Sequence, residues 1–202
     1  MTSRQEKAIE TKKRILRTAL DLFSEKGFDR VSVDEIVRES GTSKGAFYGH
    51  FTSKYDIFLE KFKEIDQFYS DFQESLPESL SAEQKIRKLA IAQMEYLRDE
   101  MGRDGIRSLY AYALTPSVDN YLSDTERPLY AILEQLISEG QKKGELTSSV
   151  SSGRLALLLS RSMRGTLYDW AIFDGDFDLS GEIDGWLELL FRGIRNKLKN
   201  RE

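Results

Sequence analysis

The chain of 202 residues has no cysteine, a single histidine and three prolines. Without cysteine there are no disulfides, thiolate metal sites or cysteine nucleophiles, and one histidine argues against a histidine-based triad or metal cluster. Residues 1–17 are polar, unlike a secretory signal, and no run reaches the ~18 apolar residues of a membrane helix. These absences predict a soluble cytoplasmic protein that is not an enzyme and has no metal, cofactor or membrane partner.

The net charge of −4 is unevenly distributed along the chain. Residues 1–63 hold 13 Lys and Arg against 10 Asp and Glu, whereas the other 139 residues hold 17 against 24. A small basic region followed by a larger acidic one is typical of a nucleic-acid module joined to a second region. An excess this small also arises by chance, so the charge alone leaves both interpretations open.

Apolar residues recur at intervals of three and four along most of the chain, which predicts helices. The first helix ends at Gly27, and a long one follows from about Lys54. Further helices are expected over residues 82–100, 105–114, 125–143, 152–173 and 181–199. Loops are expected at 76–81, 115–123, 144–151 and 174–180; the last is rich in aspartate but lacks the spacing of a calcium-binding loop. The predicted fold class is all-α.

Two short helices joined by a tight turn are predicted within residues 31–54. Ser32 followed by Glu35 is a capping box that begins the first of them. Gly41 can adopt positive φ without a Cβ penalty, so the chain can turn sharply there. Thr42 or Ser43 then caps the second helix. Behind a longer first helix, this is the helix-turn-helix pattern, in which the second helix enters the major groove of DNA.

The second short helix has an inward pair, Phe47 and Phe51, and outward residues suited to DNA. Lys44 can bind guanine or a phosphate, Gly45 allows close approach, and Ala46 can touch a thymine methyl group. Tyr48 and His50 can form hydrogen bonds with phosphate oxygens.

Basic residues outside this helix are the other candidates for contact with the DNA backbone. Ser53 is predicted to cap the next helix, with Lys54 in its first turn. A cation there is unfavourable for the helix dipole, so we expect Lys54 and the free N–H groups to hold an anion. A basic run near the N-terminus either meets DNA or forms a solvated face: Arg4, Lys7, Lys12, Lys13, Arg14 and Arg17.

The stretch I-V-R-E-S-G-T-S-K-G-A-F-Y-G-H-F-T-S-K resembles the signature of the TetR/AcrR family of bacterial transcriptional regulators. The signature is specific because its parts occur here at the same spacing: the turn glycine, the caps, Tyr-x-His-Phe and the final lysine. The resemblance covers about residues 11–62, and the turn Gly-Gln-Lys-Lys-Gly-Glu-Leu at 140–146 is also reminiscent of the family. Gly49 stands where the family pattern has a larger residue beside Tyr48. This removes one possible contact with DNA, so the resemblance does not predict which operator sequence is bound.

The resemblance implies an Ω-shaped homodimer that acts as a repressor on a palindromic operator in double-stranded DNA. Residues 1–53 form its helix-turn-helix DNA-binding domain. Residues 54–202 form a helical body that binds a small-molecule effector and dimerises through its last two helices. The family pattern places these residues near DNA: Ser32, Thr42, Ser43, Lys44, Gly45, Ala46, Tyr48, His50 and Lys54.

The body gives weaker signals. The helix over 152–173 is apolar on more than one side, as at a subunit interface, and with the helix over 181–199 it can form a four-helix bundle across a dimer. Expected interface residues are Leu155, Leu159, Trp186, Leu190 and Ile194; the core of a monomer is the alternative. Expected effector-binding residues, which also fit plain core, are Tyr96, Tyr110, Met163, Arg161, Arg164, Tyr168 and Trp170. The two arginines either bind an anionic ligand or pair with an acid such as Asp169.

Two other function classes are conceivable for such a helical chain. An enzyme lacks support because the sequence shows no nucleophile–base pair, metal cluster or phosphate-binding loop. A DNA-organising or partner-binding helical protein without an effector remains the alternative to a ligand-responsive repressor. The sequence leaves the effector, the operator and the regulated genes open.

Overall fold

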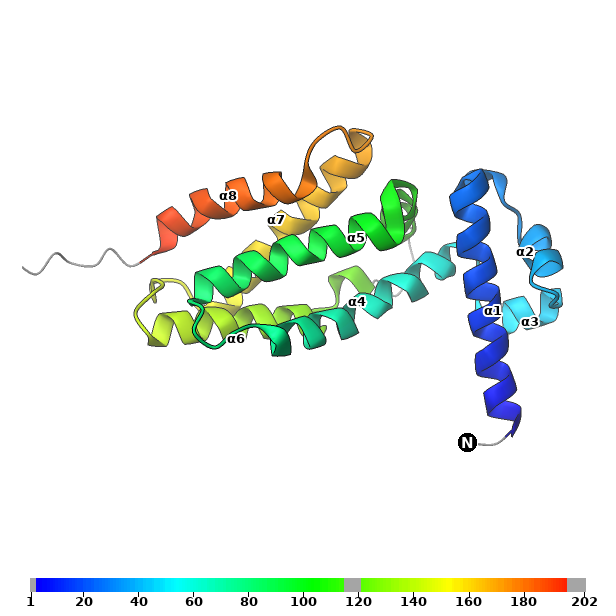
Figure 1. Cartoon of the computed structure of the whole chain (residues 1–202), viewed down its shortest axis with the longest axis horizontal. Helices are drawn as coiled ribbons and strands as arrows, with labels where there is room; N and C mark the ends of the chain where they lie inside the picture. Colours follow the sequence, from blue (N-terminus) through cyan, green and yellow to red (C-terminus); the bar gives the residue numbers. More distant parts are fainter. Residues whose placement is uncertain (1–2, 115–120, 196–202) are drawn as a thin grey trace, which may run out of the picture.

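The computed structural model describes residues 3–114 and 121–195, which form eight α-helices and two short 3₁₀-helices. A head contains α1 (Ser3–Lys26), α2 (Val33–Glu39) and α3 (Lys44–His50), and α4 (Tyr55–Ser75) leads from it into a body (Figure 1). The body is completed by α5 (Ala82–Ala113), α6 (Pro128–Lys142), α7 (Ser152–Ile172) and α8 (Leu179–Ile194). Within the described ranges there is an isolated bridge between Leu146 and Arg195 but no strand, so the all-α prediction is confirmed.

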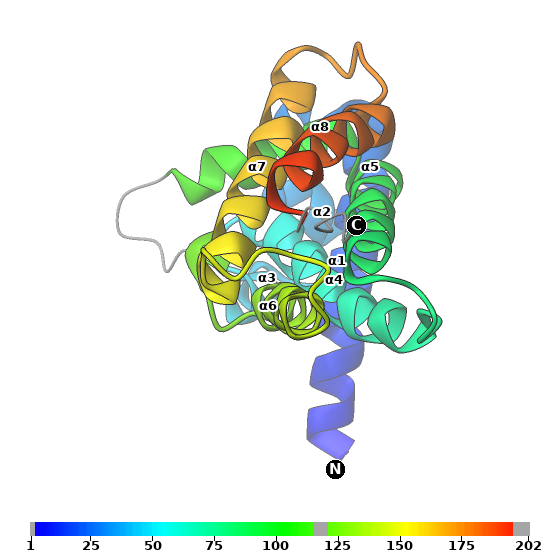
Figure 2. The ribbon, with the colours of Figure 1, turned by 90° about the vertical axis from the view of Figure 1, so that its left-hand side faces the viewer.

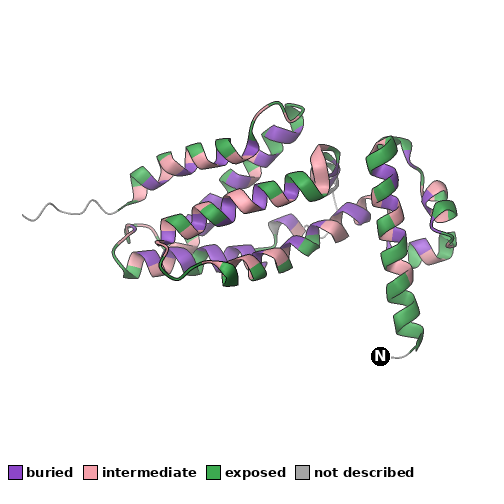
Figure 3. Ribbon diagram, viewed as in Figure 1, coloured by how far each residue is buried: buried purple, intermediate pink, exposed green. Residues whose placement is uncertain are grey.

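The first helix, α1, buries one stripe made by Ile15, Ala19, Leu22 and Phe23. The first turns of α1, over residues 3–10, are exposed (Figure 3). The helix ends as predicted at Gly27, which has φ 81° and donates its N–H to the Phe23 carbonyl at 2.9 Å. The chain then forms the 3₁₀-helix η1 (Phe28–Arg30) against the body.

The head and the body have separate hydrophobic cores, and α4 contributes to both. Ile57 and Phe58, from its first turn, lie in the head core, whereas Phe62, Ile65 and Tyr69 lie in the body core. The head core therefore extends past the predicted boundary at residue 53. Viewed along the long axis (Figure 2), α5, α6, α7 and α8 surround the common interior of the body.

A kink divides α5 at Gly102, which has φ 63° and ψ 175°. This matches the two helical segments expected over 82–100 and 105–114. Just beyond the kink, a Cβ at Gly105 would lie 2.9 Å from the Phe58 ring, so glycine allows α5 to pack closely on the start of α4. Met101 also packs against the head core. The kinked part of α5 is thus a contact between body and head.

The turn at residues 140–146 lies where the end of α6, the start of α5 and the end of α8 meet, since Leu146 forms the bridge with Arg195. A Cβ at Gly140 would lie 2.6 Å from Cβ of Ala82, so only glycine fits where α6 crosses the start of α5. Gly144 has φ 75°, and the Glu145 carboxylate accepts the Ala82 N–H at 2.7 Å, which caps α5. These contacts explain the glycine and glutamate of the sequence motif.

The aspartate-rich segment predicted as a loop over 174–180 is a turn as far as Asp178, and its last two residues already belong to α8. Asp174 has φ 57° and its carboxylate accepts from Arg107 Nη2 at 2.7 Å, while Asp178 is the N-cap of α8. The helix expected over 181–199 begins at Leu179, and residues 196–199 lie outside the described residues. No helix in the described part of the chain has the length and apolar character to cross a membrane.

Candidate nucleic-acid interface

The first half of the helix-turn-helix, α2, is anchored by its N-cap. Ser32 Oγ accepts the Glu35 N–H at 3.2 Å, which is the N-cap half of the predicted capping box, while the Glu35 side chain bonds elsewhere. The Glu35 carboxylate accepts from Lys26 Nζ at 2.6 Å, and this hydrogen bond lowers the pKa of Glu35 below its ordinary value. The cap and the ion pair together fix α2 against the end of α1.

The turn between α2 and α3 is closed by side chains as well as by glycine. Gly41 has φ 61°, and the next N–H, of Thr42, donates to the Val37 carbonyl at 3.0 Å. The hydroxyls of Ser40 and Thr42 share a hydrogen bond at 2.8 Å. Ser43, rather than Thr42, caps α3, because its Oγ accepts the Ala46 N–H at 3.1 Å.

The second helix of the motif, α3, has clearly divided faces. Phe47 and the following Phe51 are fully buried in the head core. Tyr48 is 56% exposed, and Lys44 and Gly45 are exposed beside it. The predicted residues Ala46 and His50 are half-buried on the flanks of this face. The structure therefore brings the predicted DNA contacts of α3 together on one outer surface.

Two glycines on α3 have no packing role inside the protein. A Cβ at Gly45 would meet Ser43 Oγ at 3.8 Å, an ordinary contact, and one at Gly49 would meet nothing within 4 Å. Both have helical backbones, where glycine costs about 1 kcal/mol relative to alanine. Their small size instead leaves the outer face of α3 open to close approach by another molecule.

The position of Lys54 shows that the prediction of an anion held by its ammonium group is wrong. Its ammonium group donates to the carbonyls of Phe28 and Val31 at 2.8 and 3.1 Å and lies 4.1 Å from the centroid of the Phe28 ring. Lys54 is itself the N-cap of α4, a place expected for Ser53. The ammonium group thus fixes η1 to α4 and does not face outward to hold an anion. The acceptors are 26 and 23 residues upstream, so the local sequence gave no sign of them.

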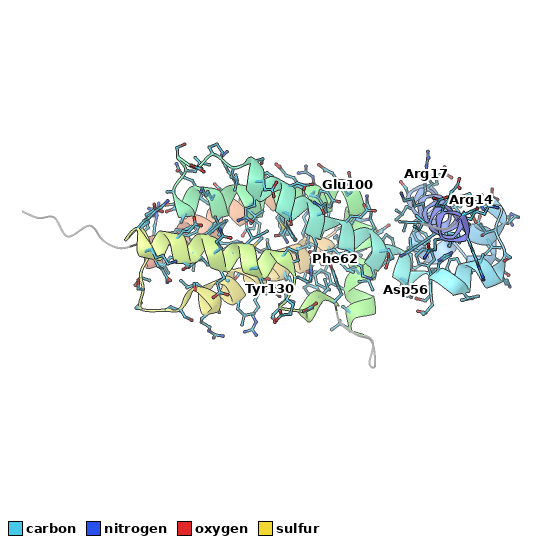
Figure 4. The ribbon with its side chains drawn as sticks, turned by 90° about the horizontal axis from the view of Figure 1, so that it is seen from below. Arg14, Arg17, Asp56, Phe62, Glu100 and Tyr130 are labelled. Carbon is cyan, nitrogen blue, oxygen red and sulfur yellow. The ribbon has the colours of Figure 1, made fainter. Side chains whose placement is uncertain are left out.

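Basic groups of the head differ in how freely they face solvent. Lys44 Nζ lies 2.6 Å from Asp34 Oδ1, an acidic neighbour that was not among the predicted site residues. Lys12 pairs with Glu60 of α4 at 2.5 Å. Arg14 and Arg17 are exposed and project from α1 (Figure 4). The exposed arginines, more than Lys12, suit contact with a phosphate backbone.

A small cavity lies at the centre of the body. Its volume is about 20 Å³, and its walls come from four α-helices and the 3₁₀-helix η2 (Tyr121–Ser123), including Phe62 of α4 and Tyr130 of α6, which Figure 4 labels. Most of the lining is apolar, but buried polar groups also reach it, among them Gln93 and Ser160. Within the described residues, Gln93 Oε1 has no hydrogen-bond partner.

Three of the predicted effector residues line this cavity: Tyr110, Met163 and Arg164. The Tyr110 hydroxyl donates to the Arg164 carbonyl at 2.8 Å, and Arg164 Nη1 donates to the Leu122 carbonyl at 2.8 Å. Arg164 therefore has a backbone partner, not the acid suggested by the sequence. Burial raises the pKa of Tyr110 well above its ordinary value.

The other four residues predicted to bind an effector do not line this cavity. Tyr96 stacks on Phe68 in an outer groove between α5 and α4. Arg161 and Tyr168 are exposed on α7, and Trp170 packs beside Gly175. A helical period gives the spacing of residues along a helix but does not tell which of them face this cavity once the helices have packed.

An ion pair that no sequence pattern indicated lies beside the cavity. Arg127 Nη2 lies 2.8 Å from Asp66 Oδ1, and the guanidinium lies between the rings of Phe62 and Tyr121, at 4.8 and 4.5 Å. The Tyr121 hydroxyl donates to the same carboxylate. Asp66 is on α4 and Arg127 precedes α6, so the pair joins two cavity walls. Their 61-residue separation left no local signal.

The predicted dimer residues divide into two groups. Leu155 and Leu159 are buried in the body's own core, so their assignment to a subunit interface is wrong. Trp186, Leu190 and Ile194 are half-buried against that core. Other apolar side chains of α7 and α8 are exposed instead: Leu158, Ile172 and Leu189. The apolar pattern of the sequence did not distinguish these exposed residues from the buried ones.

Known proteins are similar to this chain both in the head alone and over nearly its whole length. Residues 15–60 match the bacterial regulatory proteins of the tetR family. The chain is 23% identical over 184 residues to the fatty acid metabolism regulator protein of Bacillus subtilis, spanning 91% of this chain and 95% of that protein. The FadR repressor of Thermus thermophilus, solved with lauroyl-CoA, has a TM-score of 0.76 at 21% identity, covering 95% and 98% of the two chains. FadR of Bacillus subtilis, solved with stearoyl-CoA, has a TM-score of 0.71 at 22% identity, covering 90% and 98%.

Proposed function

We propose, from the premise that the chain belongs to the TetR family of bacterial transcriptional regulators, that it is a ligand-responsive repressor binding a palindromic operator as a homodimer. The observation that carries this proposal is the outer face of α3, where exposed Tyr48 and Lys44 stand beside two glycines that the fold does not require. Such a face suits the major groove, which admits a helix and presents guanine and thymine edges to it.

Each candidate contact has a role in this function. Lys44 donates to a guanine edge, and Tyr48 and His50 contact phosphates. Gly45 and Ala46 let the helix approach the bases. The caps Ser32 and Ser43 lie at helix starts, where backbone N–H groups also favour phosphate. Thr42 and Lys54 act through the fold of the turn and of η1.

Dimerisation uses the outer faces of α7 and α8. Leu158 and Ile172 of α7 and Leu189 of α8 are exposed, and Leu189 keeps 68% of its surface in contact with solvent. A Cβ at Gly165 or Gly185 would meet nothing within 4 Å, so these glycines leave the helix surfaces open to a partner. Two such helices from each subunit form a four-helix bundle. The two heads then read half-sites about one DNA turn apart, ~34–36 Å.

The effector we propose is a long-chain fatty acyl-CoA. The support is the largely apolar lining of the body cavity and the acyl-CoA found in the FadR structures of similar fold. At about 20 Å³ the cavity has room for one water, so an acyl chain enters only as the surrounding helices move apart. The alternative without an effector is less favoured, since it gives this cavity and these relatives no role.

The helix that transmits this movement is α4. It carries Phe62 and Tyr69 in the cavity wall and, on the same helix, Ile57 and Phe58 in the head core. Displacing one end of α4 therefore turns the head and changes the spacing of the two recognition helices. A ligand that favours the displaced state weakens DNA binding by the factor by which DNA weakens ligand binding.

The test adds acyl-CoA thioesters of increasing chain length, and coenzyme A alone, to the chain bound to its operator. Long-chain thioesters should release DNA and coenzyme A alone should not. Met163→Phe fills the cavity and should remove this response, whereas Met94→Phe, at an equally buried methionine away from the cavity, should retain it. Operator binding that no thioester changes would reject the effector class and leave the DNA-binding function standing.

A further inference from the structure

Asp34 places a negative charge on the surface that the proposed function turns toward DNA. Its Oδ1 lies 2.6 Å from Nζ of Lys44, and the two side chains are 67% and 61% exposed. Asp34 is in the first turn of α2, and Lys44 is the first residue of α3, so the pair bridges the two helices of the motif. The hydrogen bond to Asp34 raises the pKa of Lys44 above its ordinary value.

A lysine ammonium group can serve two acceptors at once, because it carries three N–H donors. When Lys44 meets a guanine edge, the ammonium can keep its bond to Asp34 and donate its other hydrogens to O6 or N7 of the base. A complex held by phosphates alone is different, because a phosphate is negatively charged and is repelled by the Asp34 carboxylate, whereas a guanine edge is uncharged. The same carboxylate therefore affects the two kinds of complex in opposite directions.

We propose that Asp34 is a specificity-determining residue, which holds the Lys44 ammonium for a guanine edge and weakens binding through phosphates alone. This inference rests on the proposed function, and it adds an acidic residue whose role is to lower affinity for DNA of the wrong sequence. Asp34 acts through Lys44, so it is a positioning residue.

The experiment compares Asp34→Asn with the unaltered full chain on two duplexes, the selected operator and a scrambled sequence, across a range of salt concentrations. An exposed ion pair corresponds to a factor of roughly 1.4 to 5 in an equilibrium constant. For each head of the dimer, we expect the variant's affinity for the scrambled duplex to rise about threefold. Its affinity for the operator should fall about threefold for each head. The slope of log affinity against log salt should steepen by about one for each head on scrambled DNA, as Lys44 gains a phosphate.

Two further variants separate this mechanism from general charge repulsion. Glu39→Gln removes an acidic charge from the other end of α2, where it pairs with Arg38 at 3.0 Å, and should leave the ratio of the two affinities unchanged. In a Lys44→Ala background, Asp34→Asn should have no further effect on that ratio, which a double-mutant cycle measures. Circular dichroism of each variant verifies that the fold is retained.

The proposal is overturned if Asp34→Asn raises affinity for both duplexes equally, or if its effect persists undiminished in the Lys44→Ala background. Either result would mean that Asp34 acts by long-range repulsion and not by holding Lys44. Failure of the unaltered chain to bind any duplex is a distinguishable result, because it contradicts the proposed function itself.

Discussion

Replacing Lys54 by methionine should destabilise the head, although the lysine stands in a motif associated with DNA contact. The ammonium group donates to the Phe28 and Val31 carbonyls at 2.8 and 3.1 Å and lies over the Phe28 ring. Hydrogen bonds from a charged donor contribute about 1.5–3 kcal/mol each and an exposed cation–π contact about 0.5–1 kcal/mol. Methionine keeps the apolar stem but removes the charge and all three contacts.

The net loss should be smaller than that sum, because Lys54 is half-buried and water can reach the freed carbonyls. We expect about 2 kcal/mol, which for a chain of this size lowers Tm by about 4–8 °C. Thermal unfolding followed by circular dichroism measures this shift, with the exposed Lys13→Met as matched control on the same head.

DNA binding gives the second readout for Lys54. Because the ammonium group is engaged within the head, the variant should keep the slope of log affinity against log salt at temperatures where the head is folded. An unchanged Tm together with a slope reduced by about one for each head would refute this reasoning. It would mean that Lys54 leaves the carbonyls and neutralises a phosphate.

Three more predictions address the body. Gly140→Ala should cost about 1–3 kcal/mol in urea unfolding, because the new Cβ would stand 2.6 Å from that of Ala82; a loss within the error of the fit would contradict this close packing. Burial, with Asp66 beside it, raises the pKa of Tyr121 from 10.0 to about 12. The folded chain favours the protonated phenol, so the contribution of this group to stability is complete below pH 10 and is lost as pH rises through about 12. In a pH series of unfolding curves, Tyr121→Phe should therefore remove the part of the alkaline loss of stability that Tyr121 causes. Leu189→Glu should convert dimers into folded monomers in sedimentation velocity, and persistence of the dimer would exclude this face of α8.

The DNA-binding head could be predicted from sequence in detail because its signals are local. The capping serines act on N–H groups three residues away, and Gly41 supplies the positive φ that the turn requires. Alternation of buried phenylalanine with exposed tyrosine on α3 follows from the helical period alone. Lys54 was the exception, since its acceptors come from a distant segment.

The body could be predicted only as a set of helices. Leu155 and Leu158 are both leucines on the same apolar helix, yet one is buried and the other exposed, and the difference depends on how α7 is rotated against α5 and α6. Asp66 and Arg127 meet across 61 residues of sequence, which no periodicity encodes. Long-range packing decides these positions, and a helical pattern contains little information about it.

Selection of bound duplexes from a random DNA pool, at two salt concentrations, tests the central claim most directly. The unaltered chain should recover a two-fold-symmetric site whose half-sites are centred about one helical turn apart. Tyr48→Ala, which removes an exposed side chain from α3 and leaves the buried Phe47 in place, should lose that site. Recovery of no shared sequence, or of the same site by the variant, would contradict the assignment of α3 as the helix that reads DNA.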